Sequence, residues 1–420
     1  MEDQDKTKVR HGAVRWLEGF LVLSTAILLV TPMFAKVFHM PVDVVVHGSE
    51  ARLEMPALTW SAWQNGTYQQ RIDEYLAQQT GLRGFLVKLY NQTQYSLFGV
   101  LAKGHGTRIC KGRGGWLYEE DYVKHYMKAP KVSDQTIDHF VKHLAALQQL
   151  FSERGATFVV LVSPSKPEIY PEHLPSGVRR FDAVQPGVNA YGAFIEALKR
   201  EGIRYYDAHA KFLEWKQAGP PLFAPGGTHW NYYGVQLVAN DLLRILHGNA
   251  GLTLPVLPEV TGANWLEPLG TDIDLRSLLN LWHFKGDGRV KAPYPVMTRH
   301  SSEGGAKRIK VVVVGDSFSF TLVDAMTRTD AVDQIELLYY FKRRFRYDMR
   351  ESGVPPGYSL DHAGFEVGPF TPENLDWNEV FRDVGLVILE LNEIMPKAEG
   401  WGFPKAAKNR LRELNQGRSG

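Results

Sequence analysis

The chain has 420 residues, of which 44% are hydrophobic, so it is long enough to form a large domain with a substantial core. This composition excludes a disordered or fibrous protein. The 48 basic and 46 acidic side chains leave a formal net charge of +2, which gives no electrostatic footprint for nucleic acid.

The single cysteine, Cys110, limits the chemistry open to the chain. One thiol cannot form an intramolecular disulfide or a multi-cysteine metal site, and Cys110 itself is expected to be a bystander. No other cluster has the spacing of metal ligands. We therefore expect no metal and no cofactor, and a reaction carried by oxygen and nitrogen groups.

Residues 19–35 form an apolar, uncharged stretch that Trp16 precedes. With its flanks it is just long enough to cross a bilayer core of about 30 Å. Lys and Arg residues lie before it, which predicts that this end stays in the cytoplasm. We expect a cytoplasmic tail at 1–15 and an uncleaved transmembrane anchor at 16–38, in the inner membrane of a bacterium. A cleaved signal peptide is the alternative, and either would export the rest of the chain to the periplasm.

Residues 39–130 are expected to form a spacer and a helical lead-in. Apolar and aromatic residues recur at three- and four-residue spacings from about 62 to 98, which predicts helices. The glycines at 81 and 84 separate two such helices.

Residues 131–420 alternate between helical patterns and apolar strands, as expected of a catalytic α/β domain with a mostly parallel sheet flanked by helices. Uninterrupted apolar runs are typical of strands covered on both faces. Helices are predicted at 133–154, 187–201 and 230–246, and strands at 156–163, 203–208, 309–317 and 386–393.

Two stretches rich in Gly, Pro and aromatic residues, about 248–305 and 342–380, interrupt this alternation. We expect insertions that lie over one end of the sheet, which is where open α/β folds bind ligands.

The apolar strand at 311–314 runs directly into Gly315, Asp316 and Ser317. A serine at a strand-to-helix turn presents its hydroxyl at the carboxyl edge of the sheet, and its own N–H lies near a helix N-terminus. Ser317 can therefore be a nucleophile, with Asp316 in a supporting position. It can equally be an ordinary helix cap.

A serine nucleophile needs a base, because its hydroxyl must lose a proton as it attacks. Among the 14 histidines, His229 is the best placed, in the glycine-rich loop at 225–234 that opens a helix. Such a loop lies where a base could meet Ser317. We predict that His229 is this base and that the adjacent Trp230 contacts the substrate.

Together these segments resemble the alginate O-acetyltransferase family of the AlgJ and AlgX type, whose exported domain is a permuted relative of the SGNH hydrolases. In that family a D-x-H-W segment precedes a G-D-S segment, and here His229 with Trp230 matches the first and residues 315–317 match the second. Further blocks in the same order extend the similarity over most of residues 60–395. The resemblance implies an SGNH-hydrolase-like fold, Ser317 as nucleophile and His229 as base.

The chain departs from the family pattern at Gly227, where the family has an aspartate that orients the histidine. Loss of that role in a serine triad costs several orders of magnitude in rate. Three explanations are open: another acid at a strand end, Asp207, Glu390 or Glu393; a Ser-His dyad oriented by a backbone carbonyl; or a degenerate site. Asp207 is the acid that we assign, and Asn392 is a candidate oxyanion contributor.

The segment at 339–347 places basic residues among aromatic ones. Tyr340, Arg343 and Arg344 could bind a sugar chain, with ring faces on the sugars and guanidinium groups on carboxylates. A solvated basic face after a strand is the equally good alternative.

The sequence thus predicts transfer of an acetyl group to hydroxyls of an extracytoplasmic polysaccharide through an acetyl-serine. The resemblance implies a membrane-bound O-acyltransferase as the partner that supplies acetyl groups. A carbohydrate acetylesterase and a non-catalytic polysaccharide-binding component of an export complex are the alternatives.

Overall fold

A computed structural model gives the structure of the chain. It describes residues 16–34 with gaps, 44–48, 53–79, 82–101, 108–128, 133–178, 180, 190–249, 252–285, 290–298, 307–349, 364–394 and 396–416. The chain divides into two compact units, one made of Met1–Gly106 and Ser277–Phe284 and the other of Thr107–Arg276 and Lys285–Gly420.

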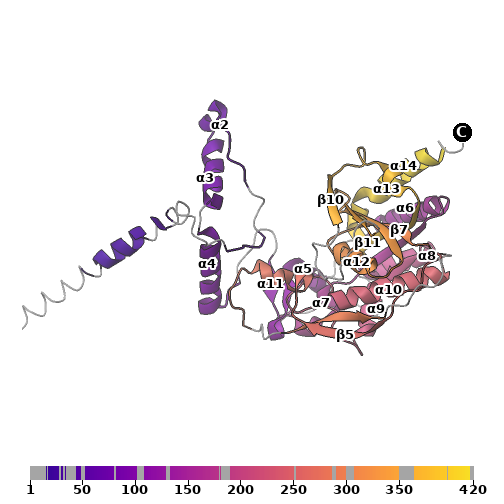
Figure 1. Cartoon of the computed structure of the whole chain (residues 1–420), viewed down its shortest axis with the longest axis horizontal. Helices are drawn as coiled ribbons and strands as arrows, with labels where there is room; N and C mark the ends of the chain where they lie inside the picture. The colour runs from indigo at the N-terminus through magenta and orange to yellow at the C-terminus, as the bar shows by residue number, and fades with distance from the viewer. Residues whose placement is uncertain are drawn as a thin grey trace, which may run out of the picture. The chain divides into compact units, whose positions relative to one another are not determined.

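Within residues 60–98 the first unit contains three helices, α2 (Trp60–Gln64), α3 (Thr67–Gln79) and α4 (Arg83–Phe98) (Figure 1). The helical pattern predicted for about 62–98, with a break near 81–84, agrees with these bounds. Helix α4 ends because Gly99 adopts a left-handed conformation with φ 68°, which glycine reaches without steric cost.

The anchor expected at 16–38 lies partly outside the described residues. No helix in the described part of the chain is both long and apolar enough to span a bilayer.

The second unit is built around a seven-stranded sheet with the order β10-β9-β8-β7-β11-β3-β4. Its strands are β3 (Thr157–Ser163), β4 (Tyr205–Asp207), β7 (Ile309–Gly315), β8 (Val332–Tyr339), β9 (Arg343–Asp348), β10 (Gly364–Pro369) and β11 (Val384–Asn392).

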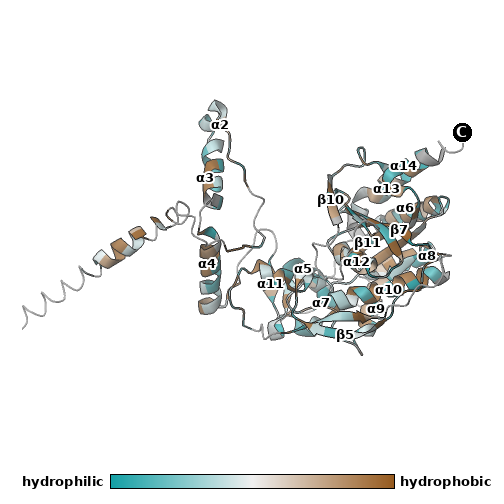
Figure 2. Cartoon of the chain, viewed as in Figure 1, coloured by the Kyte–Doolittle hydropathy of each residue, from teal (hydrophilic) through white to brown (hydrophobic). Residues whose placement is uncertain are grey.

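Helices cover both faces of this sheet. Along β7, Val311 and Val313 belong to one apolar cluster and Val312 and Val314 to the other, and all four are fully buried. Successive side chains of a strand point to opposite faces, so an unbroken run of valines fits only a strand covered on both sides. The helices around the sheet carry apolar and polar residues side by side, as helices that bury one face do (Figure 2).

One cluster includes residues of α5 (Glu120–Lys128), α9 (Ala208–Trp215), α10 (Tyr232–Asn249) and α12 (Phe318–Thr327). The other includes residues of α6 (Asp134–Ser152), α8 (Ala190–Arg200), α13 (Trp377–Phe381) and α14 (Phe403–Gln416).

The sheet is mixed, so the expected parallel pairing holds for five of its seven strands and fails at one edge. The pairs from β8 through β7, β11 and β3 to β4 are parallel, whereas β9 and β10 add an antiparallel edge. Both of these edge strands come from the stretch at 342–380, so much of that stretch extends the sheet instead of covering its end.

Two small antiparallel sheets complete the second unit. One pairs β1 (Ile109–Lys111) with β2 (Leu117–Glu119), and the other pairs β5 (Val260–Leu266) with β6 (Ala292–Met297). The stretch at 248–305 also supplies a short 3₁₀ turn, η4 (Gly270–Ile273), and the one-turn helix α11 (Asp274–Leu278).

A buried ion pair joins α9 to the end of β11 at the carboxyl edge of the sheet. His209, in the first turn of α9, bonds through Nδ1 to Glu393, which follows β11 and also accepts a hydrogen bond of 2.7 Å from the Ser165 N–H. Burial alone would lower the pKa of His209, but the charge and hydrogen bond of Glu393 outweigh it and raise that pKa to about 9.

This pair makes stability depend on pH in a defined window. Because the folded-state pKa of His209 lies above its ordinary value of 6.5, the pair contributes fully below about pH 6.5 and its contribution is lost as the pH rises through 9. Wild-type protein is expected to lose a few kcal/mol of unfolding free energy across that window relative to His209→Gln. Urea unfolding of both proteins at pH 6, 7.5 and 9.5 measures it, and parallel losses in the two proteins would contradict it.

Candidate active site

Ser317 lies at the turn between β7 and α12, at the centre of the sheet. It occupies the N-cap position of α12, but its side chain makes no capping hydrogen bond and its backbone is helical (φ −66°, ψ −18°). The hydroxyl is therefore not used as a cap, the ordinary role that the sequence left open. It remains available for another partner.

That partner is His229. Its Nε2 lies 2.8 Å from Ser317 Oγ, and its Nδ1 lies 2.5 Å from Asp274 Oδ2. An ionised carboxylate only accepts hydrogen bonds, so Nδ1 carries the proton and Nε2 accepts the serine hydroxyl. The three side chains have the arrangement of a serine relay, in which an acid orients the base that activates the serine.

Asp274 is the first residue of α11, and backbone amides hold its carboxylate in place. Its Oδ1 accepts hydrogen bonds from Thr228 N at 2.9 Å and Leu275 N at 2.5 Å, which leaves Oδ2 for His229. The His229 and Asp274 side chains are only 13% and 26% exposed, so solvent screens their interaction weakly.

The geometry explains why position 227 carries glycine. A Cβ placed on Gly227 would lie 2.1 Å from the carbonyl oxygen of Thr271 and 3.1 Å from the carbonyl carbon of Asp272. No side chain fits there, because η4 fills that space. Arg276 N also donates to Gly226 O at 2.9 Å, so the loop and the turn of α11 are joined through their backbones.

The acid bonded to His229 is none of the three that the sequence suggested, which corrects the assignment of Asp207. Its carboxylate caps α9 by accepting from Ala210 N at 3.0 Å and accepts a second bond of 2.7 Å from the Tyr191 hydroxyl. Asp207 ends β4, three strands from β7, a separation of roughly 14 Å at normal strand spacing. Sequence reasoning missed Asp274, whose only signal was its place in the expected insertion.

Lys166 fixes the loop that carries His229. Its ammonium group is buried and lies 2.7–2.9 Å from four backbone carbonyl oxygens, those of Leu117, Ala224, Pro225 and Gly227. The rings of Trp116 and Tyr118 lie 4.8 and 5.1 Å from it. Burial holds the pKa of Lys166 well below its ordinary value. The carbonyls of a glycine-rich loop thus find a shared donor, which sets the loop's conformation.

Two buried carboxyl groups, those of Asp316 and Glu390, lie next to the turn that carries Ser317. Glu390 accepts hydrogen bonds from Ser163 Oγ at 2.6 Å and from Asp316 N and Ser319 Oγ at 3.0 Å each. Burial and the adjacent Glu390 raise the pKa of Asp316 well above its ordinary value. Burial also raises the pKa of Glu390, but the hydrogen bonds that its carboxylate accepts oppose that shift, so the proton of the pair stays on Asp316, which donates a hydrogen bond to Glu390.

One tyrosine and one more acid lie near Ser317 and His229. Burial and nearby Asp316 raise the pKa of Tyr340, and a hydrogen bond with the Ser317 side chain opposes that shift, so the phenol lies beside the nucleophile. Burial also raises the pKa of Glu119, whereas His229 lowers it, which places this carboxylate near the base. Tyr340 was expected at the site, but Glu119 was not.

The other expected substrate contacts are engaged in the fold. Trp230 is fully buried, and its indole N–H donates to Thr321 Oγ1 at 2.7 Å, so it cannot stack on a sugar. Arg344 is buried and pairs with Glu336 and Glu379 at 2.8 and 2.7 Å. Arg343 is exposed but pairs with Glu366.

No group of three or more His, Cys, Asp or Glu side chains that could hold a metal ion occurs among the described residues.

A family model described as the SGNH hydrolase-like domain of the acetyltransferase AlgX matches residues 109–329. The match covers more than half of the chain and includes His229, Asp274 and Ser317. The chain belongs to this family. The resemblance inferred from the THW and GDS segments is therefore confirmed.

Curated relatives of the chain match over a shorter span. The probable alginate O-acetylase AlgJ of Pseudomonas fluorescens is 23% identical over 215 residues, 50% of each chain. The protein of the same description from Pseudomonas aeruginosa is 24% identical over 197 residues, 47% of this chain and 45% of that protein. The chain thus spans about half the length of the curated relatives that it matches.

Two solved structures of the family are similar. The O-acetyltransferase domain of Pseudomonas putida AlgJ has a TM-score of 0.42 at 15% identity and covers 69% of this chain and 92% of its own. Pseudomonas aeruginosa AlgX has a TM-score of 0.41 at 13% identity and covers 72% of this chain and 68% of its own.

Restoring the family's aspartate at position 227 is expected to harm the protein. In Gly227→Asp the new Cβ would overlap the Thr271 carbonyl, cost about 1–3 kcal/mol in unfolding free energy and separate His229 from Asp274. Gly262→Asp is the matched control, because a Cβ at Gly262 meets nothing within 4 Å. Denaturant unfolding and turnover of 4-nitrophenyl acetate measure both effects. Stability and turnover of Gly227→Asp equal to those of Gly262→Asp would show that η4 does not exclude a side chain.

Proposed function

We propose that the protein is an O-acetyltransferase that acetylates hydroxyl groups of an extracytoplasmic polysaccharide. The observation that carries the proposal is the Ser317–His229–Asp274 relay, with bonds of 2.8 and 2.5 Å. Membership of the acetyltransferase family supports the choice of acetyl as the transferred group.

The reaction takes place in two half-reactions. First, His229 removes the proton of Ser317, whose Oγ forms an ester bond with the acetyl carbonyl carbon. His229 then gives the proton to the leaving group of the donor as the donor bond breaks. In the second half-reaction a sugar hydroxyl loses its proton to His229 and attacks the acetyl-serine, and Ser317 regains its proton as the sugar ester forms.

Each half-reaction passes through a negatively charged oxygen that needs hydrogen-bond donors. In the described part of the chain the Ser317 N–H makes no hydrogen bond, so it is available for this role. The Tyr340 phenol beside Ser317 is the second donor that we assign. Asn392 does not serve, because it is fully buried and donates to Ser163 Oγ and Pro164 O at 3.3 Å each.

Asp274 also weakens the case for a non-catalytic protein. That alternative rested on the absence of an acid at Gly227, and Asp274 supplies a carboxylate to the same imidazole nitrogen. An acetylesterase would use the same three residues with water as acceptor, so the choice between transfer and hydrolysis depends on the acceptor.

The donor and the location belong to the same proposal. We assign the donor to a membrane-bound O-acyltransferase that passes acetyl groups outward, and the reaction to the periplasm. The apolar segment at 19–35 with basic residues before it supports an exported domain.

Replacement of the relay residues tests catalysis. Ser317→Ala should abolish turnover of 4-nitrophenyl acetate and labelling by a serine-reactive phosphonate. Asp274→Asn should lower turnover about 10³- to 10⁴-fold, because the imidazole loses its orienting carboxylate. Asp207→Asn is the matched control, since asparagine also caps a helix well, and its turnover should stay near wild type. Equal turnover in Asp274→Asn and Asp207→Asn would refute the relay. Mass gain of an added oligosaccharide then separates transfer from hydrolysis.

The protonated state of Asp316 predicts that its charge is not needed. Asp316→Asn keeps an oxygen that accepts from Phe318 N, at 2.9 Å in the wild type, and an amide that donates to Glu390. Turnover should fall by no more than about fivefold, the equivalent of one altered hydrogen bond. Asp316→Ala, which lacks both groups, should lose far more. A loss in Asp316→Asn as large as that in Asp274→Asn would mean that Asp316 acts as a carboxylate.

A further inference from the structure

A hollow of about 580 Å³ lies between α9, α10 and the start of β5. Its volume falls within the roughly 300–1,000 Å³ range of small-molecule sites. None of the three catalytic side chains lines it.

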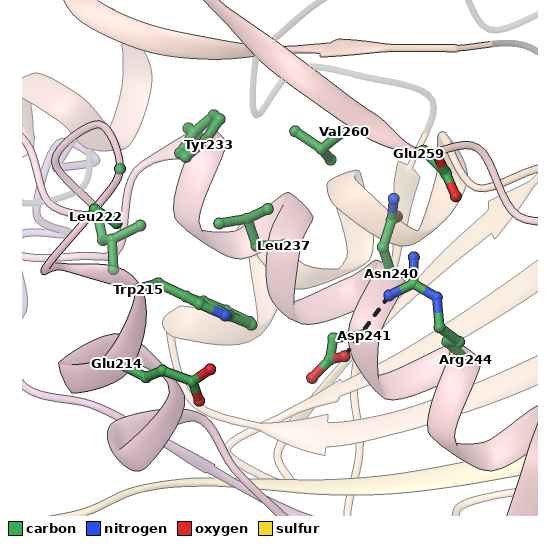
Figure 3. A pocket seen from close by; sticks show the side chains of 12 residues that line it. Glu214, Trp215, Leu222, Tyr233, Leu237, Asn240, Asp241, Arg244, Glu259 and Val260 are labelled. Carbon is green, nitrogen blue, oxygen red and sulfur yellow. Dashed lines mark ion pairs between the residues drawn. The ribbon is translucent and has the colours of Figure 1, made fainter.

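Apolar and aromatic groups form much of its wall. Trp215 reaches into it from the end of α9, while Tyr233 and Leu237 lie along one face of α10 (Figure 3). All three are half-buried, so each keeps part of its surface open to solvent.

The polar groups of the wall are mainly carboxylates. Glu214, Asp241 and Glu259 line the hollow, and Arg244 is the single cation among its lining residues. Arg244 lies 3.8 Å from Asp241, which also accepts a hydrogen bond of 2.9 Å from the Tyr206 hydroxyl. Lys211 lies 3.5 Å from Glu214 and 3.9 Å from Asp241. The lining therefore keeps an excess of negative charge.

One end of the hollow is fixed to the segment that carries the base. Tyr233 follows His229 by four residues, and Leu222 pairs with the same segment through its carbonyl, which accepts from Asn231 N at 2.9 Å. The adjacent Phe223 forms a β-bridge with Trp230. A ligand in the hollow would therefore lie against the same local framework that positions the imidazole.

We propose that this hollow binds an uncharged sugar segment of the acceptor polysaccharide while another sugar of the same chain is acetylated at Ser317. The proposal rests on the proposed function and adds a substrate class to it. Aromatic rings pack on the C–H faces of sugars, and carboxylates accept hydrogen bonds from their hydroxyls. A uronate polymer would bring its own carboxylates against Glu214, Asp241 and Glu259, which repel it.

The test separates binding in the hollow from chemistry at Ser317. Probes are neutral hexasaccharides of glucose, mannose and galactose and, as the charged comparison, a mannuronate hexasaccharide. Trp215→Ala removes the aromatic wall, and Glu259→Gln removes an exposed carboxylate with little effect on packing. Trp265→Ala is the matched control, because Trp265 is 46% exposed in β5 and does not line the hollow.

Both hollow variants should turn over 4-nitrophenyl acetate at the wild-type rate, since water needs no sugar site. With a neutral hexasaccharide, Trp215→Ala should raise the KM for acetyl transfer about tenfold with kcat little changed, and Trp265→Ala should leave both values unchanged. The proposal would be overturned if the KM for acetyl transfer in Trp215→Ala equalled that of the wild-type protein. A preference of the wild-type protein for the mannuronate hexasaccharide would also overturn it.

A direct measurement of hexasaccharide binding tests the hollow without relying on catalysis. Saturation-transfer NMR of each hexasaccharide with Ser317→Ala should show contacts that Trp215→Ala in the same background abolishes. If the wild-type protein did not hydrolyse 4-nitrophenyl acetate, the proposed function alone would be contradicted, because the NMR experiment still measures hexasaccharide binding. Absence of binding by every neutral hexasaccharide, or binding that Trp215→Ala leaves intact, would refute the hollow as a sugar site.

Discussion

The close approach of the loop at Gly227 to the carbonyl of Thr271 determines how the rest of the site is built. A Cβ would come within 2.1 Å of that oxygen, so position 227 must be glycine and the acid of the family's motif has no room there. The segment that excludes the side chain leads directly into Asp274, whose carboxylate reaches His229 Nδ1 at 2.5 Å. The acid that contacts the histidine therefore lies on the segment packed against the histidine's loop and not on the loop itself, and its position is that of an orienting carboxylate.

A relocated acid is useful only if the loop and the facing segment keep a fixed distance, because the relay tolerates little misplacement. Lys166 meets this need by binding the carbonyls of Ala224, Pro225 and Gly227 at 2.7–2.9 Å from inside the unit. On the other side of the loop, Arg276 N donates to the Gly226 carbonyl and Thr228 N donates to the Asp274 side-chain Oδ1, and these bonds hold the loop against the facing segment. Burying an ammonium group is costly, and the cost is offset here by four carbonyl oxygens and two aromatic rings that surround the group.

Much of the fold and part of the candidate site could be predicted from local sequence patterns. The features that depend on long-range packing could not. The strand before Ser317 and the loop around His229 could be found because each is a short sequence signal at a predictable sheet edge. Asp274 could not be found in this way, because the sequence does not distinguish it from Asp272 two residues earlier. Only the packing does so: Asp272 is fully buried and accepts a hydrogen bond of 3.1 Å from the Tyr294 hydroxyl. Asp207 was placed at the correct edge, but strand order is not visible in the sequence. Trp230 was predicted to contact the substrate. It is buried instead because α12 packs against the residues that precede α10, and this packing is not visible in the sequence.

The charged side chains near the site favour a neutral acceptor over an acidic one. The arginines of β9, which suggested binding of acidic sugars, are paired: Arg344 and Arg346 share Glu336 and Glu379, and Arg343 is held by Glu366. Glu119 and Asp274 lie around His229. In the proposed reaction these carboxylates would assist deprotonation of a neutral hydroxyl, because they stabilise the imidazolium that forms when the sugar loses its proton. A polyanionic acceptor would have to overcome the same charges, so recognition by apolar ring faces and hydroxyl hydrogen bonds is the arrangement that fits both steps.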